Sequence, residues 1–150
     1  MLSNTTSVSI QFGDCDPAGI VYYPNYFRMF DNATAALLST GFGMNKRLWL
    51  EHYQIAGIPM VDTGAKFFIP SQFGDVIEIR SEITELGRSS FSVRHQVMRG
   101  TDLAIEAVEK RVWVKRDANG AIRSAPLPDD VRNRLAGRSR PVPAPSAFVV

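Results

Sequence analysis

The sequence predicts an α+β domain in which an antiparallel sheet wraps around one long helix. From Pro59 onward, apolar residues recur at every second position, which is the period of half-buried strands. Before that point, helical spacing dominates a single long stretch. Short connections that contain glycine separate the later apolar runs and favour antiparallel neighbours.

The N-terminal part predicts a strand, a loop and the long helix, in that order. The strand is indicated by three alternating apolar residues, Val8, Ile10 and Phe12. Turn-forming residues then fill positions 13–19 and interrupt both periodicities. Pro24 suits the first helical position, because its missing N–H would be unpaired there. The helix is expected to continue to Thr40, with Gly41 as its stop.

The C-terminal part predicts four strands and a final hairpin. The alternating runs lie within residues 61–69, 77–83, 91–97 and 108–114. Asn119 and Gly120 form a strong hairpin turn signal. Short helices are expected near 46–53 and 128–135.

Composition excludes several classes of protein. A chain of 150 residues fits one domain, expected over residues 1–136, with a proline-rich tail over 137–150. The net charge of +2 lacks the clustered basic face of a nucleic-acid-binding protein. No apolar run is long enough to span a membrane, and no signal peptide is visible. Cys15 is the only cysteine, so we expect a reducing, cytoplasmic location without an intramolecular disulfide.

The loop before the long helix contains the residues most suited to chemistry. Asp14 and Asp16 lie in a loop of glycine and proline that leads into a helix N-terminus. Such an N-terminus offers unpaired N–H groups that can polarise a carbonyl oxygen, and a nearby carboxylate can attack that carbonyl or deprotonate a water. A thioester suits this pairing, because its thiol leaving group has a pKa of about 8.5 and needs little acid assistance. Aspartates in such loops are also common turn formers.

The run GDCDPAGIV at residues 13–21, followed by YPNY at 23–26, resembles the signature of the 4-hydroxybenzoyl-CoA thioesterase family. The order of predicted strands agrees with that family over about residues 5–125. The resemblance implies the hotdog fold and hydrolysis of an acyl-CoA thioester. It also implies that Asp16 is the catalytic carboxylate, as nucleophile or general base, and that the N–H of Tyr23 holds the thioester oxygen.

The same resemblance suggests residues that bind substrate. Asp31 on the long helix would face the acyl group and could bond a phenolic hydroxyl, although a solvated helix position is the alternative. Ile58 and Pro59 would lie where the family's second strand runs past the acyl pocket. The turn around Arg88, with Ser89 and Ser90, would bind the CoA nucleotide, although Ser89 replaces a second basic residue that the family often has. An ordinary hairpin turn is the alternative.

Other titratable residues have simpler interpretations. Asp14 is expected to bond loop amides, because alternate residues of an extended loop point apart. Cys15 is expected to pack, since flanking carboxylates disfavour a thiolate. His95 is expected to point into the packed face of the sheet, and His52 to lie on a surface helix. Neither histidine has a second ligand at metal spacing, so we expect no metal and no cofactor.

Unpaired edge strands predict a homodimer or homotetramer, and the resemblance implies a site between subunits. Tyr22, Phe27 and Phe30 could form a flat, aromatic-lined cavity, so an aromatic acyl-CoA is the expected substrate, with short or medium aliphatic acyl-CoAs as the alternative. A second class of function is a non-catalytic acyl-CoA-binding sensor, which predicts binding without turnover.

Overall fold

The computed structural model describes residues 1–138, and most of the expected tail from residue 137 on lies outside them. Five strands form one antiparallel sheet in the order β1-β3-β4-β5-β2. Their bounds are Ser3–Ser9 for β1, Met60–Phe67 for β2, Val76–Leu86 for β3, Ser90–Arg99 for β4 and Asp102–Val112 for β5. The first two strands along the chain are therefore the two edges of the sheet.

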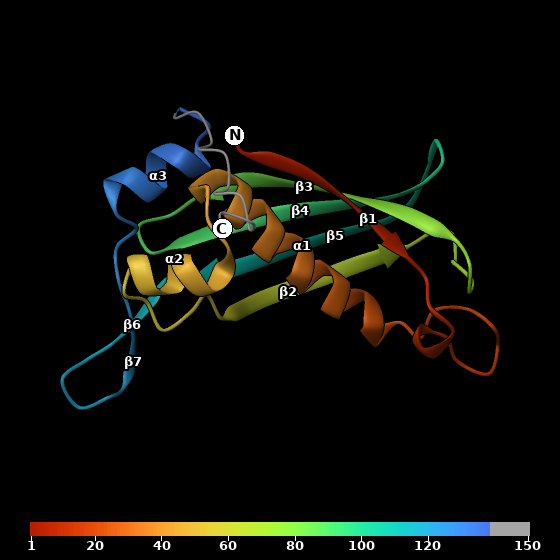
Figure 1. Cartoon of the computed structure of the whole chain (residues 1–150), viewed down its shortest axis with the longest axis horizontal. Coiled ribbons are helices and arrows are strands. Elements are labelled where there is room, and N and C mark those ends of the chain that lie inside the picture. Colours follow the sequence, from red (N-terminus) through yellow and green to blue (C-terminus); the bar gives the residue numbers. More distant parts are fainter. Residues whose placement is uncertain (139–150) are drawn as a thin grey trace, which may run out of the picture.

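Helix α1, Pro24–Phe42, lies across the sheet as the sequence predicts (Figure 1). Pro24 occupies its first turn, and Gly43 ends it in the left-handed conformation at φ +68°. The helix runs past the predicted stop at Gly41. A Cβ on Gly41 would come within 2.5 Å of the Leu2 side chain, so this glycine permits close packing against the N-terminus.

The first strand lies earlier in the chain than the sequence predicts. Strand β1 ends at Ser9, and Phe12 begins a short 3₁₀ turn, Phe12–Asp14, with a 79% exposed side chain. The turn forms because the Asp14 carboxylate accepts a hydrogen bond from the Gln11 N–H at 2.8 Å. A polar contact of this kind competes with strand pairing in a way that hydrophobic alternation does not reveal.

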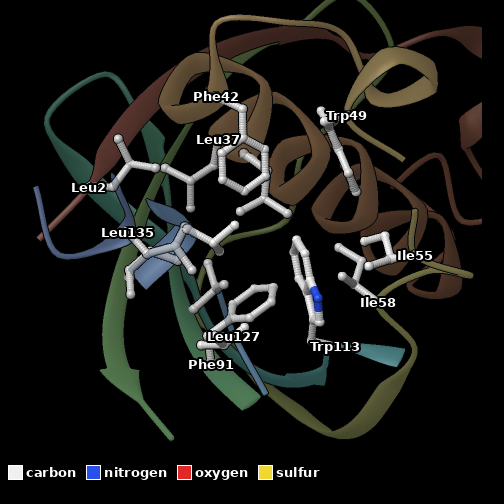
Figure 2. Close-up of a cluster of buried hydrophobic side chains, with 14 residues drawn as sticks. Leu2, Leu37, Phe42, Trp49, Ile55, Ile58, Phe91, Trp113, Leu127 and Leu135 are labelled. Carbon is white, nitrogen blue, oxygen red and sulfur yellow. The ribbon is translucent and has the colours of Figure 1, made fainter. Parts of the chain in front are cut away.

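The remaining elements close one end of the sheet. These are α2 at Lys46–His52, α3 at Asp129–Leu135 and a hairpin of β6 at Val114–Arg116 with β7 at Ile122–Ser124. The hairpin turns at Gly120, as predicted, with φ +79°. Figure 2 shows a core cluster at this end, in which Trp113 lies near Trp49, Phe42 and Leu127. No helix of residues 1–138 has the length and apolarity that crossing a membrane requires.

Edge strand β2 differs from its neighbours because almost all of it is exposed. Seven of its eight residues are exposed, whereas β3 and β4 alternate between buried and less buried positions. Val61 and Phe67 on this strand are 57% and 47% exposed. The sheet is thus left with an apolar, unpaired edge beside α1, the kind of edge that proteins usually cover.

Candidate active site

Asp14 fastens the loop to the start of α1. Its carboxylate accepts hydrogen bonds from the Gln11 N–H and from the Arg28 guanidinium, both at 2.8 Å. Its carbonyl oxygen accepts from the Tyr22 N–H and from the Asn25 side-chain amide, both at 2.9 Å. The expectation that Asp14 is a structural carboxylate that bonds loop amides is confirmed.

Asp16 is held by its backbone but keeps part of its carboxylate free. Its N–H donates to the Ile20 carbonyl and its carbonyl accepts from the Gly19 N–H, both at 2.9 Å. Gly19 adopts φ +82°, a conformation that favours glycine and closes this turn. Asp16 Oδ1 accepts from the Ala18 N–H at 2.9 Å, while Oδ2 has no hydrogen-bond partner within residues 1–138. The side chain is half-buried.

The first free N–H at the start of α1 belongs to Tyr23. Pro24 has no N–H, and the N–H groups of Asn25 and Tyr26 donate to the carbonyls of Tyr22 and Tyr23. In the part of the chain that the structure describes, nothing accepts a hydrogen bond from the Tyr23 N–H. An unpaired N–H at the positive end of a helix dipole is suited to a developing oxyanion.

A cavity of about 330 Å³ opens beside this helix start. Its lining is mainly apolar and consists of Ile20, Val21, Tyr23, Tyr26, Phe67, Phe68, Ile69 and Pro70. Ile20, which pairs with the Asp16 backbone, and Tyr23, which carries the free N–H, both contribute to the wall. The cavity wall therefore includes the residue with the free N–H, and a backbone hydrogen bond joins Asp16 to the wall residue Ile20.

The aromatic residues of this cavity are not those that sequence reasoning selected. Phe30 does not line the cavity, because it is 1% exposed and stacks on His95, with ring centroids 5.1 Å apart. Phe67 and Phe68 at the end of β2 line the wall instead. Their only signal in the sequence is a pair of adjacent aromatic residues at a strand end, next to Pro70.

Asp31 lies on α1 about two turns after Pro24 and is half-exposed. Its Oδ1 accepts a hydrogen bond from the Arg111 guanidinium at 2.9 Å. Asp31 is therefore more than a solvated helix position, because it forms an ion pair with a buried arginine of β5.

The other predicted binding residues lie at the far end of the sheet. Register pairs Ser9 with Val76, so β3 begins beside the Asp16 loop and ends ten residues later at Leu86. At about 3.4 Å per residue, the hairpin turn containing Arg88 lies some 30 Å from that loop. Figure 1 shows these two ends of the sheet well apart.

This distant turn is tied to the C-terminal segment. The carbonyl of Arg88 accepts from the Leu127 N–H at 2.9 Å, and that of Ser89 accepts from the Trp113 N–H at 2.7 Å. The Arg88 side chain is exposed and forms no ion pair within residues 1–138. Ile58 and Pro59, just before β2, lie at the same end, since Met60 pairs with Arg111. One chain therefore does not bring Asp16 and Arg88 together.

Comparisons with known proteins agree with this architecture. The family model of the thioesterase-like superfamily matches residues 10–135. The 4-hydroxybenzoyl-CoA thioesterase of Pseudomonas sp. strain CBS-3 is 37% identical over 134 residues, which cover 85% of this chain and 94% of that protein.

Solved structures show the same similarity. A crystal structure of an aspartate-to-asparagine mutant of 4-hydroxybenzoyl-CoA thioesterase, complexed with 4-hydroxybenzoyl-CoA, superposes with a TM-score of 0.82 at 34% identity. The superposition covers 90% of this chain and 99% of that one. A gentisyl-coenzyme A thioesterase superposes with a TM-score of 0.75 at 32% identity, covering 89% and 99%. The chain belongs to the thioesterase-like superfamily and is a thioesterase with the hotdog fold.

Proposed function

We propose that this thioesterase hydrolyses an aromatic acyl-CoA and that Asp16 is its catalytic carboxylate. The observation that carries the proposal is that two groups without hydrogen-bond partners in residues 1–138 belong to one loop and helix start beside an apolar cavity. These are Oδ2 of Asp16 and the N–H of Tyr23, and the cavity wall includes Tyr23 and the Ile20 that pairs with Asp16. The acyl carbonyl oxygen would accept a hydrogen bond from the Tyr23 N–H, and the Asp16 carboxylate would act at the carbonyl carbon.

Two routes use these groups. Asp16 can attack the carbonyl carbon, which expels CoA as a thiolate and leaves an acyl–aspartyl anhydride that water then cleaves. Alternatively, Asp16 can remove a proton from a water that attacks the same carbon. In both routes the products are the carboxylate and free CoA. Single turnover in ¹⁸O-water identifies the anhydride route if the isotope appears in the Asp16 carboxylate, because water that attacks the aspartyl carbon of the anhydride is the only source of that label.

We also propose that the working enzyme is at least a dimer, paired through β2. A two-fold axis at this edge would place two β2 strands antiparallel, so each end of one sheet would lie beside the opposite end of the other. Such pairing would bring Arg88 of the partner subunit, with the partner's Ser89 and the partner's Ser90, towards the Asp16 loop. The exposed apolar residues of β2 and the 30 Å separation within one chain both support this arrangement.

Within this dimer, Arg88 would pair with a phosphate of CoA, and the partner's Ile58 and the partner's Pro59 would complete the acyl pocket. No metal or cofactor has a role in this chemistry. The single cysteine, Cys15, supports a reducing compartment such as the cytoplasm.

The acyl group is proposed to be a hydroxylated aromatic ring. The relatives named above act on 4-hydroxybenzoyl-CoA and gentisyl-CoA, and both acyl groups carry ring hydroxyls. Asp31 lies about 10 Å along the helix axis from Pro24, at 1.5 Å per residue. An aromatic ring with a hydrogen bond at each end spans a comparable distance, so the free Oδ2 of Asp31 could accept from a para hydroxyl while Tyr23 holds the carbonyl.

Release of free thiol tests the proposal. Purified protein is incubated with 4-hydroxybenzoyl-CoA, benzoyl-CoA and hexanoyl-CoA, beside the Asp16→Asn variant. We expect turnover that favours the aromatic substrates and is lost in the variant. Preference for hexanoyl-CoA would support the aliphatic alternative. Tight binding of all three esters without thiol release by either protein would support a sensor, and undiminished release by Asp16→Asn would refute the role of Asp16.

A further inference from the structure

A chain of buried polar side chains crosses the inner face of the sheet beneath α1. Ser81 on β3 bonds His95 on β4 through Oγ and Nδ1, 2.8 Å apart. His95 Nε2 lies 3.4 Å from the Glu109 carboxylate on β5. Thr34 of α1 donates its hydroxyl to the same carboxylate. None of these four residues is more than 3% exposed.

Arg111 continues this chain towards the surface. Its Nε and Nη2 donate to the two oxygens of Glu109 at 3.2 and 3.3 Å. Its Nη1 donates to the Ile58 carbonyl at 3.2 Å, and Nη2 also donates to Asp31 at 2.9 Å. Arg111 is 5% exposed, and its guanidinium bonds Glu109, the Ile58 carbonyl and Asp31. It is therefore a rigid donor to Asp31.

Glu109 remains a charged anchor for Arg111. Burial alone would raise the pKa of the Glu109 carboxyl, but the hydrogen bonds and charges of His95, Thr34 and Arg111 outweigh burial and lower it. Apolar side chains would fill this space at less cost than a buried ion pair. The charged cluster reaches the surface at Asp31, which suggests that its role is to orient the Asp31 carboxylate.

Asp31 is the half-exposed end of the cluster. One carboxylate oxygen is committed to Arg111, and the second has no hydrogen-bond partner within residues 1–138. The hydrogen bond from the Arg111 guanidinium restrains the Asp31 carboxylate and keeps its negative charge close to one point. An acceptor of this kind favours a neutral hydroxyl donor on the ligand.

We propose that Arg111 is a positioning residue that sets the preference for ring hydroxyls by holding the Asp31 carboxylate in one orientation. The inference rests on the proposed function and extends it from Asp31 to the buried pair behind it. A hydroxyl bonded to an oriented carboxylate would raise kcat/KM about ten- to a hundredfold over the same ring without the hydroxyl.

The test is the ratio of kcat/KM for 4-hydroxybenzoyl-CoA to that for benzoyl-CoA. Asp31→Ala removes the acceptor, and Arg111→Lys keeps the charge opposite Glu109 but loses the fork of donors. We expect each variant to lower the ratio about tenfold or more. We expect the double variant to lower it no further, because both changes remove the same interaction.

Two further variants keep the test decisive. Arg94→Lys is a matched control, because Arg94 pairs with Glu82 at 2.8 Å on the same sheet, away from α1, and should leave the ratio unchanged. If Arg111→Lys does not fold, Glu109→Gln keeps an acceptor for Thr34 while it removes the charge that anchors Arg111, and it should lower the ratio in the same way.

The outcomes separate the inference from the proposed function. A ratio that Arg111→Lys leaves unchanged, or effects of the two single variants that multiply in the double variant, would overturn the positioning role. Wild-type hydrolysis without any preference for the hydroxylated ring would also overturn it, while the thioesterase proposal would stand. Absence of hydrolysis of either ester would instead count against the proposed function.

Discussion

Asp14 and Asp16 are two residues apart, yet the structure predicts opposite consequences of removing their carboxylates. The Asp14 carboxylate supports the loop, and the Asp14 side chain is only 12% exposed. The Asp16 carboxylate makes one local hydrogen bond and has a free oxygen at the proposed reaction centre. Asp14→Ala should therefore affect mainly stability, and Asp16→Asn mainly turnover.

The expected changes in the free energy of unfolding follow from the contacts that each substitution removes. Asp14→Ala loses a hydrogen bond from the Gln11 N–H to a charged acceptor, which contributes about 1.5–3 kcal/mol. It also loses the ion pair with Arg28, whose 57% exposure limits that pair to less than about 1 kcal/mol. The free energy of unfolding should fall by about 2–3 kcal/mol. Asp16→Asn retains an acceptor for the Ala18 N–H, so its unfolding free energy should change by less than about 0.5 kcal/mol.

Turnover should show the reverse order. Loss of a general base or nucleophile lowers kcat by about 10²–10⁴, or about 3–5 kcal/mol of barrier. Urea unfolding gives the stabilities, and thiol release at 25 °C gives kcat for the folded fraction of each variant. The reasoning is refuted if Asp16→Asn loses as much stability as Asp14→Ala, or if Asp14→Ala lowers kcat more than Asp16→Asn does.

Three further outcomes are expected. Val61→Asp places a charge on the exposed β2 edge and should shift the protein to monomers in sedimentation experiments, with thiol release falling in parallel; activity from a pure monomer would contradict the proposed interface. Arg88→Ala should raise KM for benzoyl-CoA several-fold but leave KM for benzoyl-pantetheine unchanged, because the shorter thioester lacks the nucleotide. The pKa of Asp130 is lowered by the hydrogen bond from the Tyr53 hydroxyl at 2.7 Å and by Arg134. A lowered folded-state pKa stabilises the fold above the unfolded value of about 3.9 and loses that contribution as pH falls, so Asp130→Asn should flatten the decline of the urea midpoint below pH 5.

Local chemistry made the helix and the turns predictable. Pro24 marks the start of α1, and Gly120 marks the last hairpin, because each fixes or permits a backbone conformation regardless of distant contacts. The structural role of Asp14 was also predicted correctly, although residues 12–14 form a 3₁₀ turn and not the extended loop on which the prediction was based. The sequence could not place Phe12, because a contact between Gln11 and Asp14 ends the strand early.

Strand β5 shows where hydrophobic patterning fails. The apolar Val108 suggests a packed position, but it is 54% exposed, whereas Glu109 and Arg111 are 3% and 5% exposed. Each charge is compensated by partners on other elements. Those on α1 and before β2 lie more than fifty residues away in the chain, and His95 on β4 lies fourteen residues from Glu109. Periodicity counts only the residue type, so it cannot detect a charge that is buried because it is paired.

The residues of the cavity are also hard to predict from sequence, because some of them come together only in the folded chain. Tyr23 and Asp16 could be grouped because they are seven residues apart. Phe67 and Phe68 reach the same cavity only because β2 returns along the sheet to that end. Their contribution depends on topology, which the order of predicted strands indicated only in outline.

The wide separation of Asp16 and Arg88 along one sheet has a consequence for mixed assemblies. If two-fold pairing builds each catalytic centre from complementary halves, a heterodimer of Asp16→Asn and Arg88→Ala chains contains one centre with both defects and one with neither. One of the two centres in each mixed dimer would then combine an intact carboxylate with an intact nucleotide contact. At low concentrations of the CoA ester, the mixture would turn over faster than either parent preparation does alone.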